Sequence, residues 1–447
     1  MKVHFIAMGG SIMHSLAIAL KKNGHEVSGS DDQIFDPART RLMEEGLLPE
    51  EGWHIDRIHQ GLDAIILGMH AFEDNPELKR ALELNIPIYS FPEFVAKESA
   101  GKQRIVITGS AGKTTITSMI MHVLKKMGKN FDYMVGAQVA GFENPVRISQ
   151  DAPVIIIEGD EYLSSRIDKK PKFLHYHPHT LVVSNISWDH INVFPSEQIY
   201  VEQFEKLVNG LEKASSVVYF EEDPKVKDVV EAQTDTEIHY LIPYSIPEYD
   251  VKEDGFYLSL GNEKGLMSVI GAHNMANIHA AWKVCELLSV EAKDFIIHIS
   301  TFIGAGIRLE TIKEEQGKIV IRDYAHAPSK VMASVDAVKS RYPSKNVIAC
   351  LELHTFSSLN KEFIPHYHES LKPADKKLVF VDPKAIQKKR MEPLKEDFIK
   401  SSFGEEHLNF VESKDEIEAF LADNASGNDV FLMMSSGNFS GLDLHNL

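Results

Sequence analysis

The sequence predicts an α/β protein of three domains. Short apolar runs alternate with amphipathic segments along the whole chain, a pattern typical of strand–helix–strand units in parallel sheets. At 447 residues the chain is too long for a single hydrophobic core. A polar segment at 97–102 and a turn at Gly304-Ala305-Gly306 interrupt the alternation. We therefore expect domains over residues 1–100, 101–305 and 306–447.

In the first domain, short runs of aliphatic residues predict strands, and apolar residues at helical spacing predict helices. The expected strands cover residues 3–7, 26–29, 64–67 and 86–89, and the expected helices cover 12–22 and 76–84. Residues 97–102 are small and polar, so we interpret them as a linker.

The same alternation continues through the other two domains. In the central domain we expect strands over 104–108, 154–157 and 181–184, and helices over 113–126, 197–208 and 274–288. Residues 235–270 hold short alternating runs and turn residues, which indicate a small β excursion. In the last domain we expect strands over 319–322, 346–350, 378–381 and 429–433, and helices over 328–340 and 413–421.

The charge balance is acidic, with 65 Asp and Glu against 47 Lys and Arg and a net charge of −18. Nucleic-acid binding needs clustered Lys and Arg, so that class of partner is not expected. The cysteines Cys285 and Cys350 are far apart and fit buried residues in a reducing compartment. The N-terminal apolar run is too short for a signal peptide, and no run is long enough to span a bilayer. We therefore expect a cytoplasmic protein without a membrane partner, and its oligomeric state is left open.

A glycine loop stands between a predicted strand and a predicted helix, in the run Thr108-Gly109-Ser110-Ala111-Gly112-Lys113-Thr114-Thr115. Glycines let the backbone turn its N–H groups inward, and the N-terminus of the helix adds partial positive charge. Lys113 adds a full charge, and the Thr114 hydroxyl suits Mg²⁺. Ile107 stands where the strict phosphate-loop motif has its first glycine, so only the shorter form is present. This form predicts a site for ATP phosphates and Mg²⁺.

Acidic and histidine residues follow two strands of the central domain. Glu158-Gly159-Asp160-Glu161 comes directly after the strand at 154–157, and Asp189-His190 comes shortly after the strand at 181–184. Carboxylates beside a phosphate loop suit a second Mg²⁺ anchor or a base that orients water. The position of His190 after a strand end favours a functional role over a structural one.

Six motifs, in this order, resemble the Mur ligase family of peptidoglycan synthesis over essentially the whole chain. They are Ile107-Thr-Gly-Ser-Ala-Gly-Lys-Thr-Thr, Glu158-Gly-Asp-Glu, Asp189-His190, Gly271-Ala-His-Asn274-Met-Ala-Asn277, Arg308-Leu-Glu310 and Asp323-Tyr-Ala-His326-Ala-Pro328. The resemblance implies an N-terminal Rossmann-like domain that binds UDP, a central P-loop ATPase-like domain and a C-terminal Rossmann-like domain. It also implies an ATP-dependent ligase that forms an amide through an acyl phosphate. Ala111 stands where the family usually has His or Asn, and Gly159 where it usually has Ala.

The resemblance implies a role for each motif residue. The catalytic residues would be Lys113, His190, Arg308 and His326. The ATP-binding residues would be Gly109, Ser110, Ala111, Gly112, Lys113, Thr114, Thr115, Asn274, Asn277, Arg308 and Asp323, with the two asparagines at the adenine, Arg308 at the γ-phosphate and Asp323 at the ribose. Thr114 and Glu158 would hold one Mg²⁺, and His190 would hold a second.

Within the family, the turn after the first strand resembles that of members that accept UDP-N-acetylmuramate. The residues implied at that substrate are Gly9, Gly10, Ser11, Met13, Ser30 and Asp31. The run Ile167-Asp-Lys-Lys-Pro-Lys-Phe-Leu-His-Tyr-His-Pro is similar to the murein peptide ligase branch, which attaches the recovered peptide L-Ala-γ-D-Glu-meso-diaminopimelate.

A second branch, the L-alanine-adding ligases, is the alternative within the family. The run Leu351-Glu-Leu-His354-Thr-Phe-Ser357 has some likeness to a Pro-His-x-[Tyr/Phe]-[Ser/Thr]-Arg segment of that branch, with Ser358 in place of the Arg. In either branch, His326 and His354 would face the incoming amine.

Two other classes of protein fit part of the sequence. Ala7-Met8-Gly9-Gly10 with Asp31 resembles a nicotinamide-dinucleotide fingerprint, but Ala7 and Ile12 replace two of its three glycines. A regulatory P-loop protein that binds nucleotide without ligase chemistry would also carry the glycine loop. Such a protein would hydrolyse ATP without forming an amide product.

Overall fold

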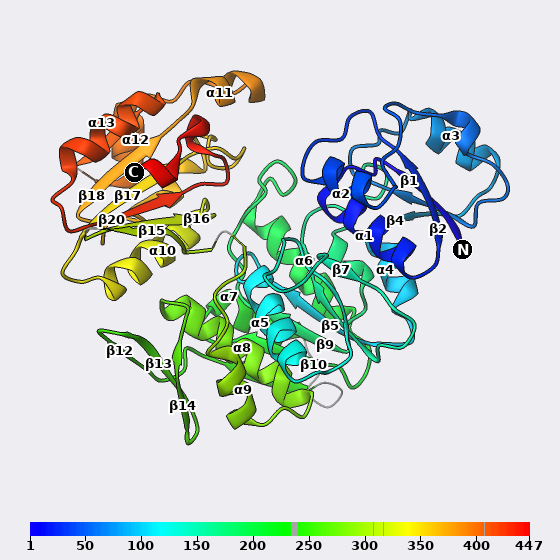
Figure 1. The fold of residues 1–447 in the computed structure, drawn as a ribbon, viewed down its shortest axis with the longest axis horizontal. Coiled ribbons are helices and arrows are strands. Elements are labelled where there is room, and N and C mark those ends of the chain that lie inside the picture. The colour runs from blue at the N-terminus through cyan, green and yellow to red at the C-terminus, as the bar shows by residue number, and fades with distance from the viewer. Residues whose placement is uncertain (234–239, 307, 316, 406) are drawn as a thin grey trace. The chain divides into compact units, whose positions relative to one another are not determined.

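The computed structural model describes residues 1–233, 240–306, 308–315, 317–405 and 407–447 (Figure 1). The chain divides into two compact units. Unit 1 comprises Met1–Ile186, Gln198–Tyr244 and Lys283–Leu288, and unit 2 comprises Ser187–Glu197, Ser245–Trp282 and Ser289–Leu447. Among the described residues, no helix has both the length and the apolar character needed to cross a membrane.

The first sheet of unit 1 is parallel, with strand order β2-β1-β3-β4. Its strands are β1 (Lys2–Ile6), β2 (Glu26–Ser30), β3 (Ala64–Leu67) and β4 (Ile88–Ser90). The accompanying helices are α1 (Ser11–Lys22), α2 (Ala38–Glu44), α3 (Pro76–Glu83) and α4 (Phe91–Glu98), with the 3₁₀ turn η1 (Ile55–Arg57). Every residue of β3 is buried, as its wholly apolar sequence predicts.

Residues 99–102 do connect α4 to β5, but the predicted polar linker at 97–102 is wrong at its start and in its exposure. Ser90 and Glu93 form a capping box that starts α4, and Lys97 and Glu98 belong to the last turn of that helix. Lys102 is buried and ion-paired with Asp132, which is completely buried. These polar residues are therefore a helix end and a buried cation, not a solvated connection.

The second sheet of unit 1 has the strand order β11-β10-β9-β5-β8-β6-β7. The strands are β5 (Gln103–Thr108), β6 (Asp132–Met134), β7 (Val146–Arg147), β8 (Val154–Glu158), β9 (Thr180–Val183), β10 (Ser216–Phe220) and β11 (Tyr240–Tyr244). The helices of this region are α5 (Lys113–Lys126), α6 (Glu197–Asn209) and α7 (Pro224–Gln233), with the 3₁₀ turn η2 (Lys172–His175). Parallel pairing of β5 with β8 and β9 places Thr108, Glu158 and Val183 at one edge of the sheet. That edge carries the candidate site.

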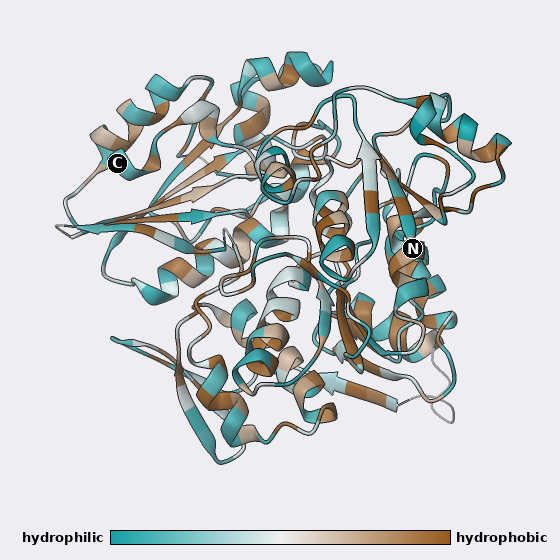
Figure 2. Ribbon diagram, turned by 45° about the vertical axis from the view of Figure 1, so that its right-hand side comes forward, coloured by the Kyte–Doolittle hydropathy of each residue, from teal (hydrophilic) through white to brown (hydrophobic). Residues whose placement is uncertain are grey.

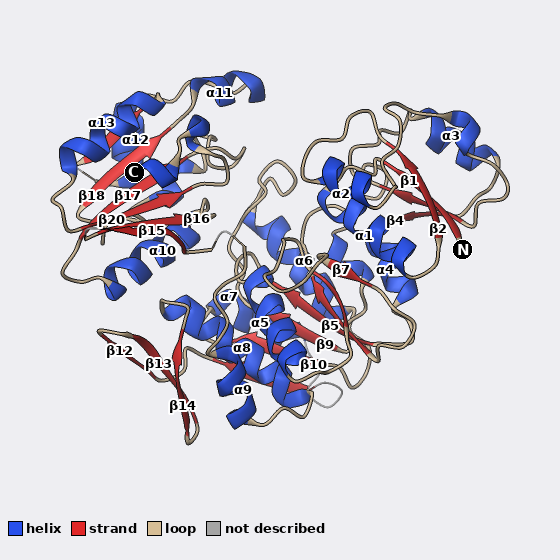
Figure 3. Ribbon diagram, in the orientation of Figure 1, coloured by secondary structure: helices blue, strands red, loops and turns tan. Residues whose placement is uncertain are grey.

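Unit 2 is built on a sheet with strand order β15-β16-β20-β17-β18-β19. Its strands are β15 (Glu310–Glu315), β16 (Lys318–Asp323), β17 (Asn346–Glu352), β18 (Lys376–Phe380), β19 (Leu408–Val411) and β20 (Asp429–Met434). Its helices are α10 (Pro328–Arg341), α11 (Pro383–Lys389), α12 (Glu396–Phe403) and α13 (Lys414–Asn424), with 3₁₀ turns η3 (Ile364–Tyr367), η4 (Phe439–Gly441) and η5 (Leu444–Asn446). Residues of α10 and α12 belong to one core cluster and those of α13 to another, so both faces of the sheet are covered (Figure 3).

The predicted β excursion at 235–270 divides between two sheets. β11 joins the central sheet, and β12 (Tyr249–Lys252), β13 (Gly255–Leu260) and β14 (Glu263–Met267) form an antiparallel sheet of their own. Residues 234–239 lie outside the described part. The helices α8 (Ala272–Leu287) and α9 (Ala292–Ile299) follow. Both cysteines are buried and unpaired with each other, which confirms the prediction that they are core residues. Apolar residues concentrate in the strands and on the inner faces of the helices (Figure 2).

Candidate functional site

The glycine loop between β5 and α5 is held by the end of β9. Gly109 and Gly112 have φ of +129° and +85°, a region that favours glycine. A Cβ atom on Gly109 would lie 2.1 Å from Ser184 Oγ, so no larger residue fits there. The Ser110 N–H donates to the Asn185 carbonyl at 3.0 Å, and the Ala111 N–H donates to Asn185 Oδ1 at 2.7 Å. The strand end therefore sets the conformation of the loop.

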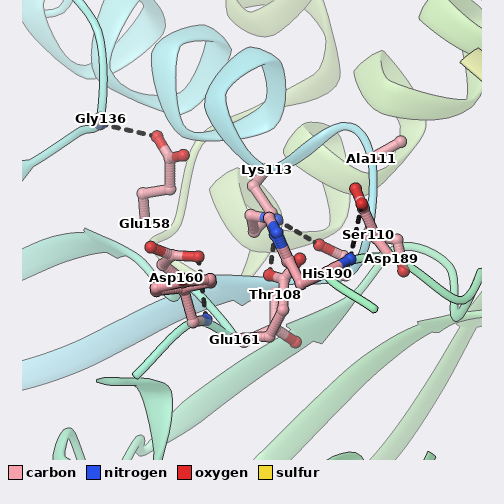
Figure 4. A network of polar contacts seen from close by, with 12 residues as sticks. Thr108, Ser110, Ala111, Lys113, Gly136, Glu158, Asp160, Glu161, Asp189 and His190 are labelled. Carbon is pink, nitrogen blue, oxygen red and sulfur yellow. Dashed lines mark hydrogen bonds and ion pairs between the residues drawn. The ribbon is translucent and has the colours of Figure 1, made fainter. Parts of the chain in front are cut away.

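Lys113 lies in the loop with its ammonium between two oxygens. Its Nζ donates to the Gly109 carbonyl at 2.6 Å and to Glu161 Oε2 at 2.7 Å (Figure 4). Burial acts to lower the pKa of Lys113, but Glu161, Asp160 and Glu158 outweigh it and raise the pKa above its usual value. Lys113 therefore stays charged at neutral pH.

Thr114 and Glu158 form a second contact at the same edge. The Thr114 hydroxyl donates to Glu158 Oε1 at 2.9 Å, and the Gly136 N–H donates to Glu158 Oε2 at 2.8 Å. Burial raises the pKa of Glu158, against the opposing effects of the Gly136 N–H and Lys113. Figure 4 shows the Glu158 carboxylate directed toward Gly136.

The rest of the acidic turn is tied to other elements. Lys172 Nζ lies 2.5 Å from Asp160 Oδ2. Burial acts to raise the pKa of Asp160, but the charges of Lys172 and Lys113 together lower it below its usual value. Tyr200, on α6, donates to Glu161 Oε1 at 3.2 Å and lies 2.7 Å from Ser110 Oγ. A chain of contacts thus runs from the glycine loop through Tyr200 and Glu161 back to Lys113.

These residues fit a nucleotide polyphosphate and a magnesium ion. The charged Lys113 and the first N–H groups of α5 together favour an anion. A hydroxyl and a carboxylate oxygen, as Thr114 and Glu158 offer, are donors that Mg²⁺ prefers. The local geometry is thus compatible with a phosphate and Mg²⁺ site, which stays a prediction.

The residues predicted at a UDP substrate gather at the ends of β1 and β2. The Gly9 N–H donates to Asp31 Oδ2 at 2.6 Å, and a Cβ on Gly9 would lie 2.9 Å from that oxygen. Gly10 caps α1 and Ser11 begins it, while Met13 and Ser30 are buried. Burial, together with the neighbouring Asp32, raises the pKa of Asp31 to about 6.

In unit 2, Asp189 is buried beside cationic groups. Lys330 Nζ lies 3.7 Å from Asp189 Oδ2, and the His190 N–H donates to Asp189 Oδ1 at 2.7 Å. Burial would raise the pKa of Asp189, but Lys330, His190 and His326 lower it to about 2. His190 itself has a φ of +57°, in the left-handed region, so the backbone turns directly after Asp189.

His326 lies in the loop between β16 and α10. Its Nδ1 is 2.8 Å from the Tyr324 carbonyl, an acceptor, so Nδ1 carries the proton and Nε2 is the acceptor of the neutral ring. Burial and Lys330 lower the pKa of His326 to about 4, so the ring is neutral at pH 7. Tyr367 donates to the backbone carbonyl of His326 and holds this loop.

Arg308 and Asp323 lie close to that loop in unit 2. The Arg308 guanidinium lies over the Tyr324 ring, 4.9 Å from its centroid. Asp323 accepts hydrogen bonds from the Ser334 hydroxyl and, at 3.4 Å, from the Leu309 N–H. Burial raises the pKa of Asp323, while Ser334 and Arg308 oppose the shift.

The remaining predicted residues of unit 2 lie at two other places. Asn274 and Asn277 lie one turn apart on α8, and Asn277 Nδ2 donates to Asn274 Oδ1 at 3.4 Å. His354 follows β17, with its Nδ1 3.5 Å from Glu352 Oε1.

Some residues of these networks carry no predicted role. Asn185 comes directly after the strand expected at 181–184, and this position is the one local feature of the sequence that indicates a functional role for it. Tyr200 and Lys330 take part through tertiary packing, and no motif of the sequence marks them. Lys172 lies in the run that begins at Ile167, but that run predicted no role for it.

Three family models match the chain in succession. Residues 2–103 match the "Mur ligase family, catalytic domain", residues 107–285 the "Mur ligase middle domain", and residues 307–437 the "Mur ligase, glutamate ligase domain". The predicted α/β fold with three such domains is confirmed, while the boundaries near 100 and 305 stay predictions.

Curated relatives and a solved structure agree with these models. The chain is 28% identical over 367 residues to the UDP-N-acetylmuramate–L-alanyl-γ-D-glutamyl-meso-2,6-diaminoheptandioate ligase of Escherichia coli, covering 79% of each chain. It is 30% identical over 454 residues to the UDP-N-acetylmuramate–L-alanine ligase of Caldicellulosiruptor bescii, covering 98% of this chain and 96% of the relative. The fold matches the crystal structure of UDP-N-acetylmuramate–alanine ligase from Thermotoga maritima with a TM-score of 0.71 at 22% identity, covering 99% and 97% of the two chains.

The motifs along the chain, the three matching models and the full-length relative lead to one assignment. The chain belongs to the Mur ligase family, and it is an ATP-dependent ligase that forms amide bonds in peptidoglycan synthesis.

Proposed function

We propose that the chain joins the carboxylate of UDP-N-acetylmuramate to the amine of the peptide L-Ala-γ-D-Glu-meso-diaminopimelate, as a step of cell-wall recycling. The proposal has two parts, the amide-forming chemistry and the choice of amine.

The turn after β17 supports the choice of a peptide. Ser358 is completely buried, and its hydroxyl accepts from the Thr355 N–H at 2.9 Å and donates to the Thr355 carbonyl at 3.2 Å. The similar segment of the alanine-adding branch has an Arg at this position. Ser358 instead closes its own turn and offers no charge.

The chemistry of the two amines explains why this matters. Free L-alanine carries a carboxylate next to its amine, and a guanidinium is the group that best binds a carboxylate. In the peptide, the carboxyl group of that alanine is part of an amide bond and is uncharged. A buried serine at position 358 therefore suits the peptide better than the amino acid.

The relatives include both branches, since the Caldicellulosiruptor bescii relative is named for L-alanine, and one of them supports the peptide. The Escherichia coli relative is named for the peptide, and the alignment with it covers 79% of each chain. The run from Ile167, which resembles the murein peptide ligase branch, is packed into the structure, with Phe173 and Tyr176 both completely buried.

In this proposal the site residues keep the roles that the family resemblance implies. Bound ATP would supply the phosphoryl group that activates the carboxylate, and Mg²⁺ would neutralise charge on the phosphates. Lys113 and the loop amides hold the phosphates, and Thr114 with Glu158 holds the metal ion. In unit 2, Arg308, Asn274, Asn277 and Asp323 contribute to nucleotide binding, and His190 binds a second ion.

His326 is proposed to contact the incoming amine. A ring with a pKa of about 4 is too weak a base to hold the proton that an ammonium must lose, but its Nε2 can accept a hydrogen bond from the amine. The His326 ring is neutral at pH 7, with Nε2 free of the proton that Nδ1 carries toward the Tyr324 carbonyl. His354, beside Glu352, is proposed to orient the same substrate.

The deciding experiment measures phosphate release with ATP, Mg²⁺ and UDP-N-acetylmuramate, adding either L-alanine or the peptide. We expect the peptide to give a kcat/KM at least about tenfold higher, the discrimination that one charged contact supplies. Mass spectrometry of the UDP product identifies the amide formed.

A response to L-alanine alone would overturn the choice of amine and favour the alanine-adding branch. The same comparison with Ser358→Arg tests the reason given above, because the added guanidinium should raise activity with L-alanine. Hydrolysis of ATP without any amide product would instead favour a regulatory P-loop protein.

A further inference from the structure

Glu93, Asp168 and His175 form a cluster that has no part in the proposed chemistry. Glu93 lies on α4, Asp168 follows β8 in the chain, and His175 ends η2. Each offers one ligand atom, and these three atoms lie within 4.8 Å of one another. We call these residues the acid–histidine cluster.

Two of the ligand atoms approach each other without forming a hydrogen bond. His175 Nε2 and Asp168 Oδ2 are 2.9 Å apart, and the His175 side chain is only 9% exposed. Both atoms are shielded from solvent, and neither has a hydrogen-bond partner. The two atoms therefore remain available as ligands for an ion. Ligand atoms of one ion at about 2.0–2.2 Å lie at such a separation, roughly 3–3.5 Å.

Neighbouring N–H groups and one hydroxyl orient both carboxylates. Glu93 Oε2 accepts from the Ser90 N–H at 2.7 Å and from the Ser90 hydroxyl at 2.8 Å. Asp168 Oδ1 accepts from the Lys170 N–H at 3.1 Å, and Asp168 Oδ2 remains for the cluster. Metal ligands in proteins are commonly held in this way by outer partners. Burial also lowers the pKa of His175, although Asp168 opposes the shift, and the neutral imidazole is the form that binds a metal.

We propose that Glu93, Asp168 and His175 bind a divalent transition-metal ion such as Zn²⁺. One imidazole nitrogen and two carboxylate oxygens suit zinc and its neighbours, whereas Mg²⁺ and Ca²⁺ prefer sites made of oxygen alone. The ion would join α4 to the segment that leads from β8 to η2. Its role would be to stabilise that segment, and it does not depend on which amine the enzyme uses.

Metal binding to the full-length, tag-free protein tests the proposal after treatment with a chelator. Co²⁺ is titrated as a spectroscopic substitute for Zn²⁺, and bound metal is counted by elemental analysis after desalting. We expect one equivalent with the visible absorption of a nitrogen- and oxygen-ligated Co²⁺ ion. In His175→Ala the affinity should fall at least about tenfold. The thermal midpoint should rise with Zn²⁺ in the parent and not in this variant.

Two control variants separate this site from other histidines and from the phosphate loop. His177 is exposed, lies two residues further along and has a φ of +44°, which asparagine tolerates, so His177→Asn should bind as the parent does. Thr114→Ala alters the glycine loop and should also keep the Co²⁺ equivalent. If circular dichroism shows that His175→Ala is unfolded, Asp168→Asn and Glu93→Gln replace it.

Equal Co²⁺ binding by the parent and the cluster variants would overturn the proposal. Absence of stoichiometric Co²⁺ binding in the parent would also overturn it. The three residues would then only form ion pairs that stabilise the fold. Neither result depends on ligase activity, so the outcome is separate from that of the proposed function.

Discussion

At the scale of single residues, charge balance governs the glycine loop. Lys113 is 13% exposed and Glu161, its partner at 2.7 Å, is 1% exposed. Glu158 and Asp160 add to the negative surroundings that keep Lys113 charged. Removing one member of a buried pair leaves the other without compensation, at a cost of about 3–5 kcal/mol.

Lys113→Ala should therefore lower kcat by at least about 10²-fold and weaken ATP binding, because charge stabilisation at the phosphates is lost. Phosphate release and equilibrium binding of ATP measure the two effects. Lys126→Ala removes an exposed lysine from the other end of the same helix and should behave as the parent. Parental affinity and turnover in Lys113→Ala would contradict the role of the loop.

Gly159 is required for space rather than for backbone conformation. A Cβ at this position would lie 2.6 Å from Val106 Cγ1 and 2.7 Å from Thr108 Cγ2. The side chains of β5 therefore leave no room for the Ala that the family pattern has at this position.

Gly159→Ala should destabilise unit 1 by about 1–3 kcal/mol, the usual effect of overpacking. Gly101→Ala is the matched control, because nothing lies within 4 Å of a Cβ there. Urea unfolding of the two variants measures the difference, and equal midpoints would show that the turn relaxes without cost.

At the scale of elements, a buried ion pair joins the start of β5 to β6. Lys102 Nζ lies 2.6 Å from Asp132 Oδ2 and also donates to the carbonyls of Ser149 at 2.6 Å and Ala152 at 3.1 Å. The Ser149 N–H donates to the same carboxylate at 2.8 Å. All three protons of the ammonium are thus satisfied inside the sheet.

Lys102→Met should cost about 3–5 kcal/mol, because Asp132 would stay buried without its cation. Lys97→Met removes an exposed lysine of α4 and should change stability by less than about 1 kcal/mol. Thermal or urea unfolding of both variants makes the comparison. Similar stabilities would mean that water replaces the lysine.

Regular elements with strong apolar patterns could be predicted from the sequence. The bounds predicted for β3 and α5, 64–67 and 113–126, are those observed. Asp63 and Gly68 flank β3, Gly112 precedes α5, and Lys125-Lys126 ends the apolar pattern of that helix. β6 could not be predicted in this way. It has three residues and begins with the buried Asp132, whose partner Lys102 lies thirty positions away.

In the candidate site, too, some residues can be predicted from their position in the sequence, and others depend on which elements pack together. Lys113 and Thr114 come shortly after β5 and Glu158 ends β8, so their contacts form where the pattern indicates. Asn185 and Tyr200 take part because β9 and α6 pack beside the loop, which depends on sheet order. No local spacing encodes that order.

At the scale of the whole molecule, pH acts on stability through buried carboxyl groups. Burial and the neighbouring Asp32 raise the pKa of Asp31 from 3.8 to about 6 in the folded protein. The folded state therefore binds this proton more tightly than the unfolded state. Protonated Asp31 therefore contributes fully to the free energy of unfolding below about pH 4, and this contribution is lost as the pH rises through about 6.

Asp31→Asn should remove this dependence. Between pH 4.5 and 7, the parent should lose stability relative to the variant, on the order of 1–3 kcal/mol. Denaturant midpoints at several pH values measure the difference. Asp56→Asn, an exposed substitution in η1, is the control and should follow the parent. A difference that grows in the opposite direction would show that Asp31 is stabilised as the anion.

The pairing of Lys113 with Glu161 has a consequence for selectivity. Any incoming anion has to compete with a carboxylate that is covalently attached nearby and thus present at a very high effective concentration. An anion that makes a single contact, such as free phosphate or sulfate, is expected to bind Lys113 little better than the Glu161 carboxylate does. A polyphosphate chain, which would engage the lysine and backbone amides together, is expected to displace it. We therefore expect Glu161 to disfavour binding of small buffer anions and free phosphate at Lys113.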